Sequence, residues 1–73
     1  MPKTSVVAIQ REIGMVVAKA RKRSRLTQQG LARKMGTRQA NISRIERGLQ
    51  NLSLDILVRL DNELGLNLKI SCL

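Results

Sequence analysis

Three glycines divide the chain into short helical segments. Gly36, Gly48 and Gly65 each follow a stretch in which apolar residues recur every three or four positions, and glycine is favoured as the left-handed residue just past a helix end. Thr27 and Ser53 stand immediately before two such stretches, where their side chains can cap the first turn of a helix. These helix-capping and helix-ending residues predict four short helices, over about residues 10–23, 28–35, 39–47 and 54–64.

The predicted core is entirely aliphatic. The chain has 73 residues, which allows one small domain spanning 1–73, and it contains no Phe, Trp or Tyr. Leu, Ile, Val, Met and Ala must therefore supply the buried surface. In the first predicted helix we expect the buried stripe to consist of Ile13, Val16, Val17 and Ala20.

The hydrophobic period changes after Gly65. Residues 66–71 alternate apolar and polar side chains, with Leu66, Leu68 and Ile70 on one side, which predicts a β-strand over 66–72. A single strand leaves its backbone hydrogen bonds unmade, so it needs a partner. We favour the same strand of a second molecule, which would make this segment a dimerisation element. Pairing with residues 5–9, or a frayed tail, are the alternatives.

Several functional classes lack the residues that they require. The chain has no His, which is the usual proton shuttle and the commonest metal ligand, so Ser-His-Asp and Cys-His catalysis are excluded. The single cysteine, Cys72, can form neither an internal disulfide nor a thiolate zinc site. We interpret it as a small apolar residue, with a redox switch across a dimer as the alternative. No apolar run is long enough for a membrane span or a signal peptide. We therefore expect no enzyme activity, no cofactor and no metal.

Positive charge is concentrated in the middle of the chain. The net charge is +9, and residues 19–47 hold ten basic side chains against one acid, Glu46. The remainder of the chain is neutral overall. A charge excess with this distribution suits a polyanion, and nucleic acid is the first candidate.

The segment from Leu26 to Gly48 combines these features. It reads LTQQGLARKMGTRQANISRIERG, which predicts a helix, a tight turn at Gly36 and a second helix. Ala32 is small enough to lie where the two helices cross. In a helix-turn-helix the second helix is laid in the DNA major groove. The segment resembles the Cro/C1-type (XRE) helix-turn-helix family at Thr27-Gln28, Leu31-Ala32, Gly36, Gln39, Ile42-Ser43, Ile45-Glu46 and Gly48.

The resemblance extends over residues 10–65 and implies a fold. It is all-α, with four short helices forming a lambda-repressor-like DNA-binding domain, to which the predicted C-terminal strand is added. Two residues depart from the family pattern. Gly30 stands where Glu usually completes a capping box begun by Thr27, and a mid-helix glycine costs about 1 kcal/mol relative to Ala. Arg38 stands where a small capping residue is common, so the cap of the third helix falls to Thr37 or is missing.

The helical period separates two faces of the third predicted helix. At about 100° per residue, the apolar side chains of Ile42 and Ile45 fall together on one side. The opposite face carries side chains that can contact bases or phosphates, namely Gln39, Ala40, Ser43, Arg44 and Arg47.

The resemblance implies individual roles for these residues. Family members read bases from the positions of Gln39, Ala40 and Arg44, and hold a phosphate with the position of Gln28. A basic residue at the position of Arg21 pairs with the acid at Glu46, which we interpret as structural. We add Arg38 and Ser43 as further base contacts. The remaining predicted phosphate contacts are Thr27, Arg33, Lys34 and Arg47.

These patterns predict a sequence-specific regulator of transcription that binds double-stranded DNA. Related proteins bind palindromic operators as homodimers, and they work in the cytoplasm on nucleoid DNA. The order of four helices followed by Leu-x-Leu-x-Ile resembles small antitoxins of the Hip and Hig types, which repress their own operon and bind a cognate toxin. The alternatives are a phage- or plasmid-type repressor, or a restriction–modification controller, without a toxin partner. A membrane-active cationic peptide is disfavoured because the predicted helices are short and capped.

Overall fold

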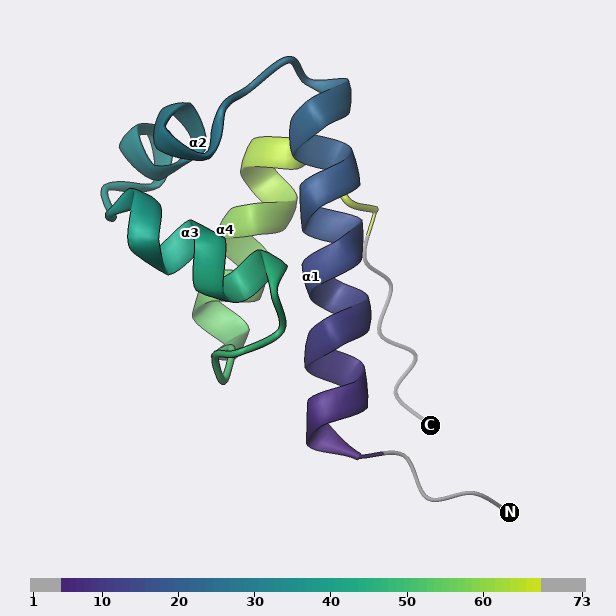
Figure 1. Cartoon of the computed structure of the whole chain (residues 1–73). Coiled ribbons are helices and arrows are strands. Elements are labelled where there is room, and N and C mark those ends of the chain that lie inside the picture. Colours follow the sequence, from purple (N-terminus) through teal and green to yellow (C-terminus); the bar gives the residue numbers. More distant parts are fainter. Residues whose placement is uncertain (1–4, 68–73) are drawn as a thin grey trace.

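A computed structural model describes residues 5–67 and contains four helices (Figure 1). They are α1 (Val6–Arg23), α2 (Gln28–Met35), α3 (Gln39–Glu46) and α4 (Leu54–Leu64). The longest helix, α1, stands along one side, and the other three gather beside it (Figure 1). The all-α fold of four short helices is thus confirmed, and residues 5–67 contain no strand. No helix within this range is long and apolar enough to cross a bilayer.

Three of the helices begin at a hydroxyl side chain that caps the first turn. Thr27 Oγ1 accepts a hydrogen bond from the backbone N–H of Gly30 (2.9 Å), and Ser53 Oγ accepts one from Ile56 (3.2 Å). These two predicted caps are confirmed. α3 has no such cap, because the side chain of Arg38 makes no capping hydrogen bond. Thr37 does not replace it, since its hydroxyl is the acceptor for the side chain of Asn41.

Three helices end in the same backbone turn, in which a left-handed residue follows the helix and two N–H groups bond back to its last carbonyls. Gly36 (φ 67°) occupies this position after α2, and Gly48 (φ 71°) occupies it after α3. After α1 the position is held by Arg25, with φ 58°. Its N–H bonds to Lys22 O, and the N–H of Leu26 bonds to Arg21 O, both at 3.0 Å. The glycine positions were predicted, whereas the left-handed arginine was not.

Three expectations about α1 are corrected by the structure. The helix begins at Val6 rather than near residue 10, because Ser5 Oγ accepts a hydrogen bond from the N–H of Ala8 (3.0 Å) and caps it. Since residues 6–9 are helical, the alternative in which residues 5–9 pair as a strand is wrong. Val16 was expected in the buried stripe but is 44% exposed.

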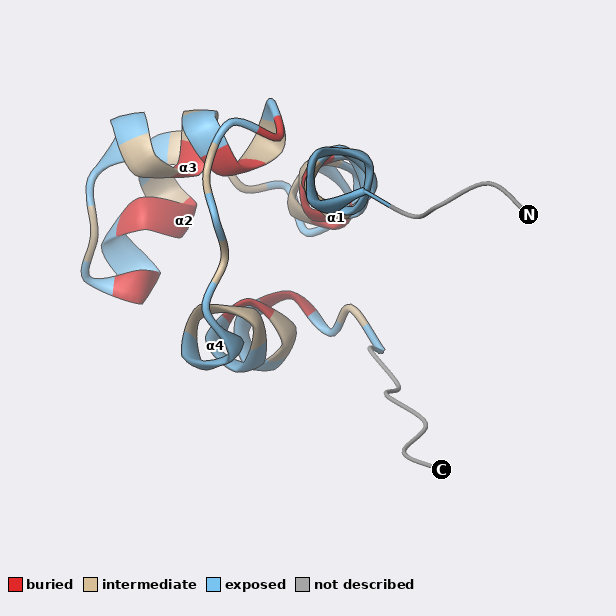
Figure 2. Cartoon of the chain, turned by 90° about the horizontal axis from the view of Figure 1, so that it is seen from below, coloured by how far each residue is buried: buried red, intermediate tan, exposed pale blue. Residues whose placement is uncertain are grey.

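Each helix contributes one fully buried aliphatic side chain to the centre of the domain. They are Val17, Leu31, Ile42 and Leu60, all 0% exposed. Around them lie the other buried core residues, which are Ala20, Ala32, Met35, Ile45 and Leu64. The buried faces of the helices point toward one another, and the exposed faces point outward (Figure 2). The expectation of an aliphatic core holds for these residues.

α1 and α3 approach each other closely at two glycines. A Cβ added at Gly14 would lie 2.5 Å from Ile45 O and 2.6 Å from Glu46 O, so the α1 backbone rests directly on the end of α3. At Gly48 the same atom would lie 2.8 Å from the Cα of Arg11. These contacts fix the distance between α1 and α3, and the hydrophobic pattern did not reveal Gly14.

The predicted C-terminal strand falls mostly outside the described residues. Leu66 lies within them and packs against the core, and the N–H of Asn67 donates to Asp61 Oδ1 (2.9 Å). Leu68, Ile70 and Cys72 lie outside the described residues. The strand over 66–72 and its pairing across a dimer therefore stay predictions.

Candidate nucleic-acid interface

One face of α3 is directed away from the core and carries the predicted base-reading side chains. Gln39, Ala40 and Arg44 are exposed, and Ser43 is half-buried. On the inner side of the same helix, Ile42 and Ile45 are almost completely buried. The structure thus separates the two faces of α3 as the helical period indicated. The outer face combines an amide, a methyl group and a guanidinium, which are groups able to contact base edges.

α2 is joined to this face by a glutamine that bonds at both ends of its amide. Gln28 Oε1 accepts a hydrogen bond from Gln39 Nε2 (2.7 Å), and Gln28 Nε2 donates to Glu46 Oε1 (3.1 Å). Gln39 and Glu46 are the first and last residues of α3. The first residue of α2 is therefore hydrogen-bonded to both ends of that helix. The bonds restrict the rotamers of both glutamines before any ligand arrives.

The far end of this chain of hydrogen bonds is an ion pair with α1. Arg21 Nε donates to Glu46 Oε2 (2.6 Å) and Nη2 donates to Oε1 (3.1 Å), so the pair is bidentate. Arg21 Nη1 also donates to the carbonyl of Leu26 (2.7 Å), in the turn before α2. The two side chains are only 11% and 7% exposed. Arg21 therefore holds α1, the following turn and α3 together and does not face solvent as a free cation.

Gln39 keeps hydrogen-bonding capacity beyond its contact with Gln28. An uncharged amide has one acceptor oxygen and two N–H donors. One N–H is used by Gln28, and within residues 5–67 the oxygen of Gln39 has no partner. An acceptor and a donor thus remain side by side at an exposed position. That combination matches the N6–H donor and N7 acceptor of adenine in the major groove.

Several exposed cations on α2, on α3 and at the ends of α3 make no ion pair within the described residues. Arg44 lies in α3 and Arg38 is its N-cap residue, and neither makes an ion pair within the described residues. The same is true of the exposed residues that we predicted as phosphate contacts, Arg33, Lys34 and Arg47. Thr27 is exposed at the start of α2, where its oxygen caps the helix and its O–H can still donate.

The amino ends of α2 and α3 add to the positive potential. Neither helix has an acidic residue in its first turn, so the partial positive charge of each N-terminus is not offset locally. Gln28 and Gln39, which are in direct contact, belong to these two first turns. The first residues of the two helices are therefore in contact through their side chains, and two unshielded helix N-termini are an arrangement that suits an anionic ligand.

The potential metal ligands among residues 5–67 stay apart. No group of three or more potential metal ligands comes together there. The carboxylate of Glu46 is occupied by Arg21 and Gln28.

The sequence pattern predicted both ends of this hydrogen-bond network, Gln39 and the Arg21–Glu46 pair. It did not predict that Gln28 bridges them, because a contact between two helices leaves no signal in the local pattern of either.

Comparison of the sequence with known protein families agrees with this geometry. A sequence profile of the helix-turn-helix family matches residues 17–70 of the chain, which is well over half of its length. No curated protein gives a significant match to this sequence. The matched region begins within α1, includes α2, α3 and α4, and covers every side chain of the hydrogen-bond network described above.

Proposed function

Because the chain belongs to the Cro/C1-type helix-turn-helix family of DNA-binding transcription regulators, we propose that α3 reads a specific operator in the major groove. Gln39, Ala40 and Arg44 contact bases, with Arg38 and Ser43 at the margins of the contact. The observation that carries this proposal is the fixed position of Gln39. Its bond to Gln28 leaves an acceptor and a donor available on an exposed side chain, and a glutamine held this way is suited to adenine.

The phosphate contacts follow from the cations and helix ends around α3. Gln28 and Thr27 stand at the amino end of α2, while Arg33, Lys34 and Arg47 are exposed and lack ion-pair partners among residues 5–67. Such contacts fix the position of a protein on the duplex without reading its sequence. The base contacts then decide which duplex is preferred.

The working unit is a homodimer. One copy of α3 reaches only a few base pairs, and paired helix-turn-helix units read two half-sites about one DNA turn apart. Residues 66–72 join the two copies by pairing as strands, as their alternating pattern indicates. A palindromic operator is the DNA counterpart of this symmetry, and the protein acts on it in the cytoplasm, on the nucleoid.

The regulated operon is the protein's own, and the dimer represses it. The same dimer is the antitoxin that binds the toxin encoded by a neighbouring gene. The support for the antitoxin role is the order of four helices and then the Leu-x-Leu-x-Ile pattern of residues 66–70. A phage- or plasmid-type repressor, or a restriction–modification controller, would share the DNA-binding face without a toxin partner. Co-expression with the products of neighbouring genes, followed by purification of the complex, separates these roles.

A binding titration tests the proposed function. Purified protein is titrated against labelled duplexes carrying its own upstream DNA or a scrambled sequence, at low and at physiological salt. We expect tight binding to the native duplex that persists at physiological salt, since specific binding is typically about 10³-fold or more tighter than non-specific binding. Equal binding to both duplexes that is lost with salt would leave only a phosphate contact and would contradict sequence-specific reading.

A further inference from the structure

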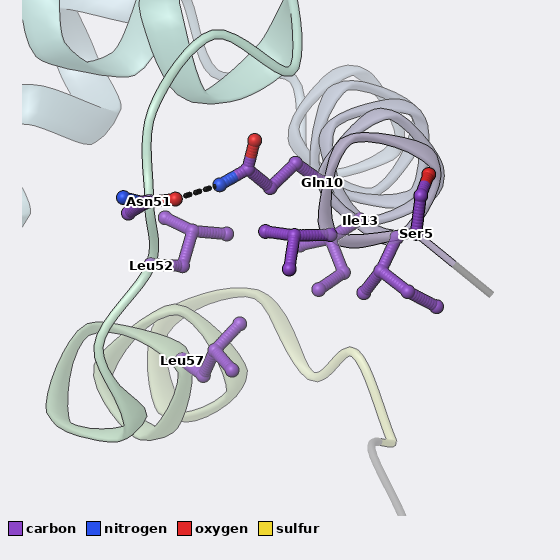
Figure 3. A pocket seen from close by; sticks show the side chains of 8 residues that line it. Ser5, Gln10, Ile13, Asn51, Leu52 and Leu57 are labelled. Carbon is purple, nitrogen blue, oxygen red and sulfur yellow. Dashed lines mark hydrogen bonds between the residues drawn. The ribbon is translucent and has the colours of Figure 1, made fainter.

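An apolar groove opens between α1 and α4, on a part of the surface that the proposed DNA contacts do not use (Figure 3). Its volume is about 410 Å³, which is within the range of ligand-binding pockets. From the α1 side it is lined by Val6, Ile9 and Ile13, and from the other side by Leu52 and Leu57. Val6 is 67% exposed and Ile9 is 40% exposed, so the groove presents uncovered hydrocarbon to solvent.

The chemistry of the lining selects an apolar occupant. The polar side chains at the rim are Ser5, Gln10 and Asn51, and none of the lining residues is charged. Ser5 caps α1, while Gln10 and Asn51 are hydrogen-bonded to each other across the rim (Figure 3). The groove therefore offers no charge for an ion, and its polar side chains lie at the rim rather than along the aliphatic lining. A short run of aliphatic side chains would cover it and remove its hydrocarbon from water.

After α4 the chain leaves the helix on the side where α1 lies (Figures 1 and 2). Gly65 and Asn67 are both left-handed, with φ 62° and 61°. Their N–H groups are bonded to Asp61, one to its carbonyl (2.7 Å) and one to its side chain (2.9 Å). This turn holds Asn67 beside the last turn of α4, and Leu66 packs on the core.

The sequence that follows has the pattern and the length that the groove requires. Residues 68–73 read LKISCL, so in an extended conformation Leu68, Ile70 and Cys72 share one side. Six extended residues reach about 20 Å, whereas α4, with 11 residues, is about 16 Å long. A segment returning along α4 would therefore be long enough to reach the groove that Leu57 and Val6 line. Lys69 would point outward into water.

We propose that residues 68–73 dock into the α1–α4 groove of their own chain. The tether favours the chain's own segment, because a few residues between two sites give an effective concentration in the millimolar range, about 10³-fold above a micromolar protein solution. A docked segment keeps one backbone edge outward, so pairing with a second copy is still possible. The inference does not depend on DNA binding.

Disulfide trapping in the full chain tests this docking, because Cys72 is the only cysteine and a disulfide requires Cα atoms within about 7 Å. Ile9→Cys places a second thiol in the groove. Met15→Cys is the matched control, since Met15 is on the same helix, 59% exposed and outside the groove lining. The control measures how often a tethered but undocked segment meets α1. Melting by circular dichroism checks that both variants keep the wild-type fold.

Mild oxidation at micromolar concentration is followed on non-reducing gels and by peptide mapping. We expect Ile9→Cys to form a disulfide with Cys72 within one chain, about tenfold faster than Met15→Cys and independently of protein concentration. Equal rates for the two variants would overturn the proposal. A covalent dimer joining residue 9 of one chain to Cys72 of another, with a rate that rises with concentration, would also overturn it, because the occupant would then be a second copy.

Discussion

The guanidinium of Arg21 donates two hydrogen bonds, of 2.6 and 3.1 Å, to the carboxylate of Glu46 and so joins α1 to the end of α3. We expect Arg21→Ala to lower the free energy of unfolding by about 3 kcal/mol, because it leaves a nearly buried carboxylate without its cation. Urea unfolding followed by circular dichroism measures this, since the chain has no aromatic chromophore. Arg33→Ala is the control, because Arg33 is exposed and its loss should change stability by no more than about 0.5 kcal/mol. Equal effects of the two substitutions would show that the ion pair contributes nothing specific.

Gly14 should tolerate no side chain. An added Cβ would lie within 2.9 Å of three backbone atoms of Ile45 and Glu46, and backbone cannot move aside as a side chain can. We expect Gly14→Ala to cost about 2 kcal/mol or more of stability in thermal melts. Gly30→Ala is the matched helical control, since its nearest contact is the side chain of Thr27 at 3.2 Å and the exchange improves helix propensity by up to about 1 kcal/mol. A Gly14→Ala variant as stable as Gly30→Ala would contradict the close backbone approach.

Arg25 occupies the left-handed position that glycine holds after α2 and α3. Arg25→Gly should raise the free energy of unfolding by about 1 kcal/mol, because glycine adopts a positive φ without the steric cost that a Cβ brings. Arg25→Ala removes the same charge but keeps the Cβ, so its stability should stay near that of the wild type. Both are measured by urea unfolding. A gain in the alanine variant equal to that in the glycine variant would assign the effect to charge and not to backbone conformation.

Replacing Arg44 and replacing Arg33 should change DNA binding in different ways. Arg44→Ala removes a proposed base contact, so discrimination between the operator and a mutated operator should fall by about 1–3 kcal/mol. Arg33→Ala removes a proposed phosphate contact, so it should weaken binding to every duplex and lower the slope against salt by about one. Titrations of both variants against both duplexes decide this. If Arg44→Ala weakened all duplexes equally, Arg44 would be a phosphate contact.

Residues 68–73 should be required for the dimer. Deleting them leaves Leu66 in place on the core but removes most of the segment proposed to pair between copies. We expect light scattering to give the mass of a monomer for the shortened chain and of a dimer for the full chain. Protein concentration is followed by refractive index, because aromatic absorbance is absent. A dimer that survives the deletion would refute strand pairing as its basis.

Features that depend on a few neighbouring residues were predictable from the sequence. Thr27 and Ser53 cap helices, and Gly36 and Gly65 end them, because each of these contacts is made within one turn of the helix. The bounds of α2 and α4 follow from these residues. The two faces of α3 were predictable for the same reason, since the angle between Gln39 and Ile42 is set by the helix alone.

Features that depend on distant backbone were not predictable. Gly14 carries no hydrophobic signal, and its partner atoms lie more than thirty residues further along the chain, in Ile45 and Glu46. Its place against α3 also explains the misassigned stripe, because the turn of α1 that was expected to bury Val16 presents the glycine to the core. The bridging of Gln28 between Gln39 and Glu46 likewise exists only once α2 and α3 have packed.

The contact at Gly14 has a consequence for how such a protein can change over generations. The position of α3 is set from its inner side, by backbone atoms at its end and by the core residues Ile42 and Ile45. None of these contacts involves Ala40 or Arg44 on the outer side. With Ala40 and Arg44 as the proposed base contacts, mutations there would alter the preferred operator while the inner contacts of α3 stay unchanged. A duplicated gene would then acquire a new target in single steps, each of which leaves these contacts in place.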